Sequence, residues 1–145
     1  MTWYTIIATI TKLTELDEFT VSTCAKVLEC TFELTASNRY RSSALQAPFD
    51  YAELILGSDK TIFALTLKDN SAREEYVLRV SGLGKPIDVD VVSSPIADKN
   101  ASKTNLDWDR KYSLCYEFGD RRVWFGIEVA GSQKKLVTVS IHKQH

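Results

Sequence analysis

Alternation of apolar and polar residues runs through most of the chain from residue 51 onward and predicts a series of β-hairpins. Glycine-containing segments at 57–60, 82–86 and 119–120 separate the alternating runs, as hairpin turns do. We therefore expect these strands, each pair joined by one turn: 52–56 with 61–67, 75–80 with 87–92, 111–118 with 123–129, and a last strand over 136–142.

The first third of the chain predicts a strand, a helix and a second strand. Residues 2–11 form a nearly continuous run of apolar and β-branched residues, which favours a covered strand. Thr14 is followed by acidic residues and by apolar residues at helical spacing, which predicts a helix over 14–26 with Thr14 as its N-cap. Strict alternation returns over 28–36 and indicates a strand.

These elements add up to one α+β domain over residues 1–145. About nine strands and one helix, connected mostly in sequence, predict a predominantly antiparallel β structure, either a sandwich or a half-barrel. The chain has 145 residues, of which 44% are hydrophobic and 26% charged, and a net charge of −1. This composition excludes a disordered chain or a disulfide miniprotein, and the near-neutral charge argues against a general nucleic-acid binder.

Compartment follows from the cysteines and the first residues. Three cysteines without a tight framework fit reduced thiols in the cytoplasm. The apolar run at 2–11 has no basic segment before it and no small-residue cleavage site after it, and it is too short to span a membrane. We expect a cytoplasmic protein without a membrane partner.

The sequence gives little support for a catalytic function. The two histidines, His142 and His145, lie within the last four residues, where chain ends fray, so we expect no preorganised general base. The common zinc, phosphate-loop and Cys-x-x-Cys patterns do not occur. The sequence therefore predicts a protein that is not an enzyme and that needs neither a metal nor another cofactor.

Acidic charge concentrates between residues 86 and 109, which hold five aspartates and two lysines. Trp108 stands between Asp107 and Asp109, and this pattern suits an interface anchor flanked by groups that bond to Arg or Lys. The alternative is that Trp108 plugs the rim of the core. Trp124 falls on the strand face opposite Val123 and Phe125, beside Gly126, and so points outward, either as a contact residue or as cover for a neighbouring strand. The candidate partner-binding residues are Asp88, Asp90, Asp98, Asp107, Trp108, Asp109 and Trp124.

In general character the chain resembles the immunity proteins of bacterial contact-dependent growth inhibition systems, and Asp88, Asp90 and the Asp107-Trp108-Asp109 cluster are the residues that fit. The resemblance implies a protein that binds a cognate protein toxin, such as a basic nuclease domain, and occludes its active site with an acidic surface. Opposed charge would give such a pair speed and specificity.

A second class of function rests on the basic residues. Arg39, Tyr40 and Arg41 interleave charge with an aromatic ring, and further pairs occur at 121–122 and 134–135, where we expect tight turns. Such residues on a sheet can bind single-stranded nucleic acid, although the acidic segment would repel phosphates. The other form of ligand binding would be a small apolar molecule held inside a β-barrel. Self-association through Trp124 or a strand edge stays open.

Overall fold

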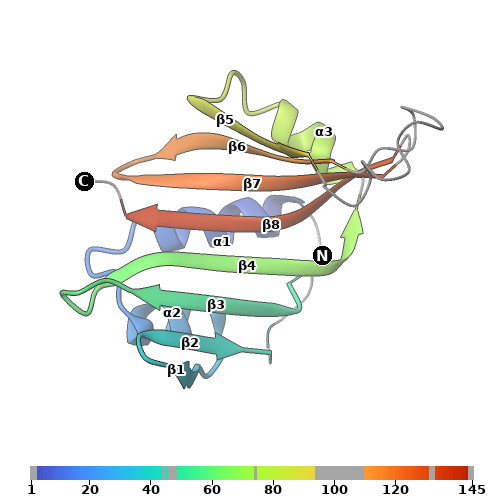
Figure 1. Cartoon of the computed structure of the whole chain (residues 1–145). Helices are drawn as coiled ribbons and strands as arrows, with labels where there is room; N and C mark the ends of the chain where they lie inside the picture. Colours follow the sequence, from blue (N-terminus) through green and yellow to red (C-terminus); the bar gives the residue numbers. More distant parts are fainter. Residues whose placement is uncertain are drawn as a thin grey trace.

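The computed structural model describes residues 3–43, 45, 49–73, 75–93, 110–130 and 133–143, which form three helices and eight strands (Figure 1). In chain order the elements are α1 (Trp3–Thr14), α2 (Val21–Leu28), β1 (Glu33–Ala36), β2 (Arg39–Ser42), β3 (Tyr51–Leu56), β4 (Ile62–Arg73), α3 (Glu75–Ser81), β5 (Asp88–Ser93), β6 (Arg110–Phe118), β7 (Arg121–Ala130) and β8 (Gln133–Lys143).

All eight strands belong to one antiparallel sheet with the order β1-β2-β3-β4-β8-β7-β6-β5. The predicted α+β class with mostly antiparallel strands is confirmed. The sandwich is wrong, because there is one sheet and not two. Since β1 and β5 are its edges and do not pair with each other, the described sheet is open and does not close into a barrel.

Three of the predicted strand groups are present almost as expected. The run at 52–56 and 61–67 forms the β3–β4 hairpin, 111–118 and 123–129 form β6–β7, and 136–142 lies in β8. The sequence patterns missed β2, a four-residue strand that pairs with β3. The predicted count of nine is wrong because two expected strands are helices and β2 is added.

The first of these corrections concerns residues 2–11, which belong to helix α1 and not to a strand. Ile6, Ile10 and Leu13 follow one another at intervals of four and three residues and are almost fully buried. That spacing places them on one helix face against the sheet, so packing overrides the strand preference of the β-branched residues.

The predicted helix over 14–26 is also wrong in its bounds, because α1 ends at Thr14 and α2 begins at Val21. Thr20, and not Thr14, is the N-cap: its hydroxyl accepts from the Thr23 backbone N–H, and the Thr23 side chain bonds back to the Thr20 N–H. Of the strand expected over 28–36, only the last four residues form one, as β1.

The third correction concerns 75–80, expected to be a strand paired with 87–92. These residues form α3, in which Tyr76, Val77 and Val80 are buried while Leu78 is 74% exposed. Alternation would have buried Leu78 together with Tyr76 and Val80, so the burial pattern is that of a helix. The strand at 87–92 is present as β5, but it pairs with β6.

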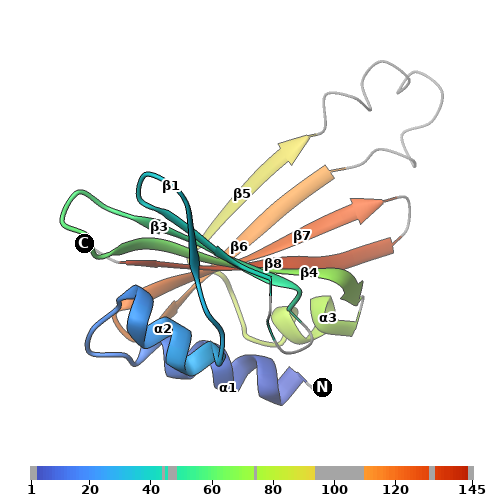
Figure 2. The same cartoon turned by 90° about the horizontal axis from the view of Figure 1, so that it is seen from below.

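The helices cover only one face of the sheet (Figure 2). In Figure 1, α1 crosses behind β8, and α2 lies behind β2 and β3. The core lies between these layers and includes Leu65, Phe125 and Ile141 from the sheet. We call the other side of the sheet the open face, because no described helix packs on it. Among the described residues no helix is long and apolar enough to cross a membrane.

Candidate functional site

Three of the seven predicted partner-binding residues lie in the described part of the chain: Asp88 and Asp90 on β5, and Trp124 on β7. Asp98, Asp107, Trp108 and Asp109 fall outside the described residues, and with them the predicted Asp107-Trp108-Asp109 cluster. The site is therefore built from β5 and its neighbours.

A turn anchored by one tyrosine leads the chain into β5. After α3, Gly84 has a φ of 100°, a left-handed conformation that suits glycine. The Tyr116 hydroxyl on β6 donates to the carbonyl oxygens of Gly84 (3.0 Å) and Val80 (3.3 Å). The Ile87 N–H then donates to the Cys115 carbonyl at 2.8 Å and begins the pairing of β5 with β6. Tyr116 thus holds the end of α3 and the turn before β5 against β6.

The strand register brings the three described candidates onto the open face. Asp88 pairs with Cys115, which in turn pairs with Trp124, so these residues form one row across β5, β6 and β7. Asp90 begins the next row, opposite Ser113. With strands about 4.8 Å apart, Asp88 and Trp124 are separated by roughly 10 Å. An aromatic side chain and two carboxylates therefore share one surface.

Trp124 itself is half-buried, whereas Cys115 between it and Asp88 is fully buried. Burial is the main reason that the pKa of the Cys115 thiol is raised. The Arg122 cation lowers it in part, and the charges of Asp88 and Glu117 raise it further. The opposite face of β7 carries Val123 and Phe125, both fully buried. The predicted division of β7 into an inner and an outer face is confirmed.

The other face of β5 is apolar and exposed. Ile87 just before the strand is 49% exposed, and Val89 and Val91 within it are 50% and 61% exposed. Val89 and Val91 lie opposite Leu114 and Tyr112, which are only partly buried. Both valines thus keep half or more of their surface exposed, and β5 presents an acidic row on one face and an aliphatic row on the other.

Charge on β5 is not neutralised by any described neighbour. Neither Asp88 nor Asp90 forms an ion pair with a described residue. Within the described part of the chain, the hydrogen bond that these carboxylates make is to the backbone, where Asp88 Oδ1 accepts from the Val89 N–H at 2.8 Å. Exposed carboxylates without an ion-pair partner add little to the stability of the fold, and these two leave negative charge on the surface of β5.

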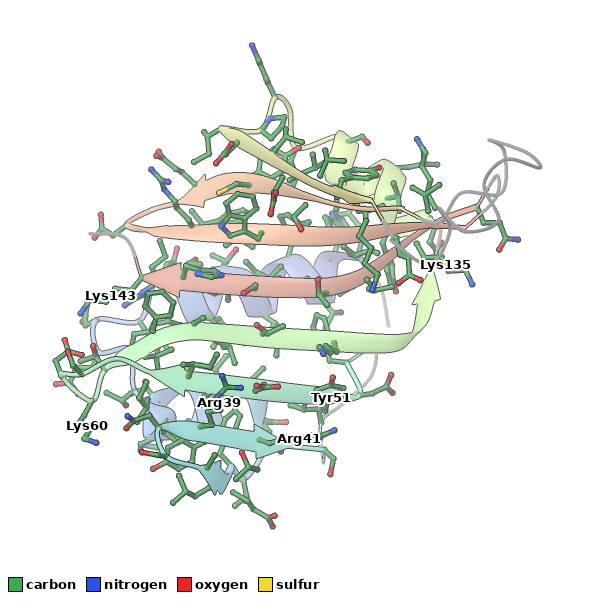
Figure 3. All side chains as sticks on the ribbon, viewed as in Figure 1. Arg39, Arg41, Tyr51, Lys60, Lys135 and Lys143 are labelled. Atoms are coloured by element: carbon green, nitrogen blue, oxygen red, sulfur yellow. The ribbon has the colours of Figure 1, made fainter. Side chains whose placement is uncertain are left out.

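A second group on the open face gathers around Tyr51 on β3. The Arg41 guanidinium lies 4.6 Å and the Lys68 ammonium 5.0 Å from the centre of the Tyr51 ring, and Figure 3 shows Arg41 and Tyr51 on neighbouring strands. Arg39, next along β2, pairs with Glu53 at 3.6 Å. Sequence reasoning grouped Tyr40 with the two arginines, but Tyr40 packs toward the core and Tyr51 takes its place.

The remaining predicted basic pairs do not lie in turns. Arg121 and Arg122 begin β7, and Lys134 and Lys135 lie in β8. Arg121 has a structural role, because its Nη1 donates to the carbonyl oxygens of Thr14 (2.7 Å) and Leu13 (3.2 Å) at the end of α1.

His142 is a residue that sequence reasoning misjudged as part of a fraying end. It lies in β8, a central strand, where its Nε2 is 2.8 Å from Ser140 Oγ, and Ser140 Oγ is 3.2 Å from Thr66 Oγ1. Burial lowers the pKa of His142. The signal for this position was the alternation of 136–142, which already predicted a strand. No carboxylate among the described residues is hydrogen bonded to His142, so a Ser-His-Asp triad is not formed there.

Other kinds of site are weakly represented among the described residues. They contain no group of three His, Cys, Asp or Glu side chains that could hold a metal ion. A shallow surface hollow of about 450 Å³ lies at the C-terminal end of α2, lined by Lys26, Glu29 and Cys30 among others. This hollow contains none of the predicted partner-binding residues, and α2 lies behind β2 and β3, at the opposite edge of the sheet from β5.

Comparison with known proteins adds little. No protein-family model and no curated protein matches the chain. A similar solved structure is a DUF4309 family protein, YjgB, from Bacillus subtilis subsp. subtilis strain 168, with a TM-score of 0.47 and 13% sequence identity over 90% of this chain and 82% of that chain. A likeness at this level assigns neither a family nor an activity to the chain.

Proposed function

We propose that this chain is a protein-binding domain of the immunity or antitoxin type, which neutralises a basic protein by covering its active site with the acidic region around β5. The observation that carries the proposal is the exposure of β5 on both faces, with Asp88 and Asp90 on one side and Val89 and Val91 on the other.

The chemistry of this edge suits a protein better than a small molecule. Exposed aliphatic side chains in a row favour contact with another apolar surface, and they occur here on a strand edge and not in a pocket. The adjacent carboxylates select a cationic partner and speed its approach. Trp124, two strands inward in the same row as Asp88 and on the same face as the carboxylates, is the large aromatic side chain that would anchor the contact.

The sequence that joins β5 to β6 strengthens the acidic character. Residues 94–109 add Asp98, Asp107 and Asp109 against two lysines. A basic nuclease domain is the partner class that this charge fits, because such domains present cations to nucleic-acid phosphates. In this proposal the protein acts in the cytoplasm, where its three free thiols stay reduced.

The experiment expresses each reading frame that flanks this gene in a sensitive host, with and without this chain, and measures growth. We expect one flanking product to inhibit growth, and this chain to restore growth and to co-purify with that product. If no flanking product is both toxic and neutralised by this chain, the immunity function is wrong.

Charge reversal then tests the acidic surface. Asp88→Lys combined with Asp90→Lys should slow association at least about tenfold and weaken its dependence on salt. Glu15→Lys combined with Glu18→Lys is the matched control, since it makes the same change in net charge on exposed residues between α1 and α2. Equal effects of the two pairs would mean that net charge, and not β5, governs binding.

The cluster around Tyr51 supports a second candidate, the binding of single-stranded nucleic acid on the open face. Arg41 and Lys68 have no ion pair with a described carboxylate, so both cations are available to phosphates. A filter-binding assay with oligonucleotides at two salt concentrations tests it, with Arg41→Ala and Lys68→Ala as variants. Absence of salt-dependent binding by the unaltered protein would exclude this candidate.

A further inference from the structure

We infer that the partner binds by adding a β-strand to the outer edge of β5, and that this strand alternates basic and apolar side chains. The inference rests on the proposed function, because it specifies how the acidic β5 region engages a protein. It differs from charge attraction alone in requiring main-chain hydrogen bonds between the two proteins.

The two edges of the sheet are built differently. At one edge, β1 has four residues, and its pairing with β2 is interrupted between Leu34 and Ala36. Short length and irregularity are common ways of protecting a strand edge from unwanted pairing. At the other edge, β5 has six residues in unbroken register with β6, from Asp88 opposite Cys115 to Ser93 opposite Arg110.

Apart from its two aspartates, β5 carries none of the residues that usually protect a strand edge. Its sequence, Asp-Val-Asp-Val-Val-Ser, contains neither proline nor lysine. No described strand pairs with its outer side, so its outward backbone groups are open to another chain. The exposed valines add an apolar surface that a neighbouring strand would cover.

The aspartates determine which strand can be added. In a sheet, side chains on one face of neighbouring strands lie next to one another. A second copy of β5 would place its carboxylates beside Asp88 and Asp90, and the repulsion would disfavour self-pairing. A strand with Lys or Arg at alternate positions would pair its cations with these carboxylates and its apolar residues with Val89 and Val91.

One hydrogen bond connects the addition of a strand to β5 with the pairing of charges at Asp88. In the free protein the Asp88 carboxylate accepts from the Val89 N–H. An added strand offers a backbone carbonyl to that N–H, which releases the carboxylate to bond a Lys or Arg of the partner. Strand addition and charge pairing would therefore support each other.

The test uses the full chain labelled with ¹⁵N and an acetylated eight-residue peptide of alternating lysine and valine as the probe. We expect the peptide to shift the amide resonances of β5 and to slow hydrogen exchange of β5 amides about tenfold or more. A peptide with glutamate in place of lysine should fail to bind. The same lysine–valine peptide N-methylated at its central amides should also fail, since it keeps the charge but lacks the N–H donors.

Two variants complete the design. Val89→Pro removes the Val89 N–H and should abolish peptide binding, while Val89→Ala keeps this donor and should weaken binding only a fewfold. If the N-methylated peptide binds as well as the unmodified one, the charge-based function stands and strand addition is wrong. If the lysine–valine peptide leaves the β5 amides unchanged, the inference is also wrong, whatever the growth assay with the flanking reading frames shows.

Discussion

Thr138 on β8 occupies the space in which a side chain at Gly126 on β7 would begin, for a Cβ atom at position 126 would collide with Thr138 Oγ1. The two residues are direct partners in the register of the central strands. The ladder shifts by one residue immediately after Gly126. Glycine is thus used in the middle of a strand to let a neighbouring hydroxyl lie over the backbone.

We expect Gly126→Ala to lower the free energy of unfolding by about 1–3 kcal/mol, the usual cost of overpacking. Thr138→Ala removes the obstructing hydroxyl, so the double variant should recover more than half of that loss. Urea denaturation of the two single variants and the double variant measures the coupling. Additive effects would show that Thr138 is not the cause of the constraint.

Arg121 closes the C-terminal end of α1 against β7, with its guanidinium 4.5 Å from the centre of the Phe19 ring. Arg121→Ala should destabilise the fold by about 1.5–3 kcal/mol, because two carbonyl oxygens lose a charged donor. The exposed neighbouring residue provides the control: Arg122→Ala should change stability by less than about 0.5 kcal/mol. If thermal denaturation shows that Arg121→Ala and Arg122→Ala lower the stability equally, the role of Arg121 in capping α1 is wrong.

His142 should make stability depend on pH. Burial holds its pKa in the folded state below the ordinary value of 6.5, so the unfolded chain binds more protons in this range. The contribution of neutral His142 is therefore present above pH 6.5 and is lost as the pH falls toward the folded-state pKa. Hydrogen bonds to Thr61 lower the pKa of Asp59 to about 2, which keeps that group out of this window.

His142→Gln should accordingly flatten the dependence of the urea midpoint on pH between 8 and 5. Glutamine retains a polar group for Ser140 but does not titrate. An unchanged slope in the variant would assign the pH dependence to other residues.

Trp124 should protect the thiol of Cys115, its partner in register. Trp124→Ala is expected to bring the raised pKa of Cys115 back toward its ordinary value and to speed its alkylation by iodoacetamide about tenfold or more. Phe63→Ala, which removes a half-exposed ring elsewhere on the open face, serves as the control. Mass spectrometry of the Cys115 peptide measures the rate of alkylation. Similar rates in the Trp124→Ala and Phe63→Ala variants would mean that Trp124 does not shield the Cys115 thiol.

Periodicity predicted the hairpins well because one face of each strand is buried. Leu65 and Leu67 on β4 alternate with the polar Thr66 and Lys68, and the core selects that pattern. On β7, Val123 and Phe125 are buried in the same alternating way. The same rule failed for short runs. Tyr76, Leu78 and Val80 fit a strand as well as Tyr76, Val77 and Val80 fit a helix, and only the exposure of Leu78 separates the two.

The candidate site depended on information that no local pattern contains. That Asp88 and Asp90 share a face followed from their spacing, and so did the outward direction of Trp124. Their meeting on one surface required the order β7-β6-β5 and the register through Cys115. The cluster of Arg41, Lys68 and Tyr51 likewise combines three strands, one of which is only four residues long.

The sheet order divides the strands into two consecutive sets of four, β1–β4 and β5–β8, which meet only where β4 pairs with β8. The hydroxyls of Thr66 and Ser140, 74 residues apart in the chain, touch across this junction. Within each set, neighbouring strands are consecutive in the chain, but joining the two sets closes a long loop, and contacts of such large sequence separation slow folding. We therefore expect the two halves to form early and to unite in the rate-limiting step. In a nascent chain, β4 and β7 would each keep one unpaired edge until β8, the last strand, has been synthesised.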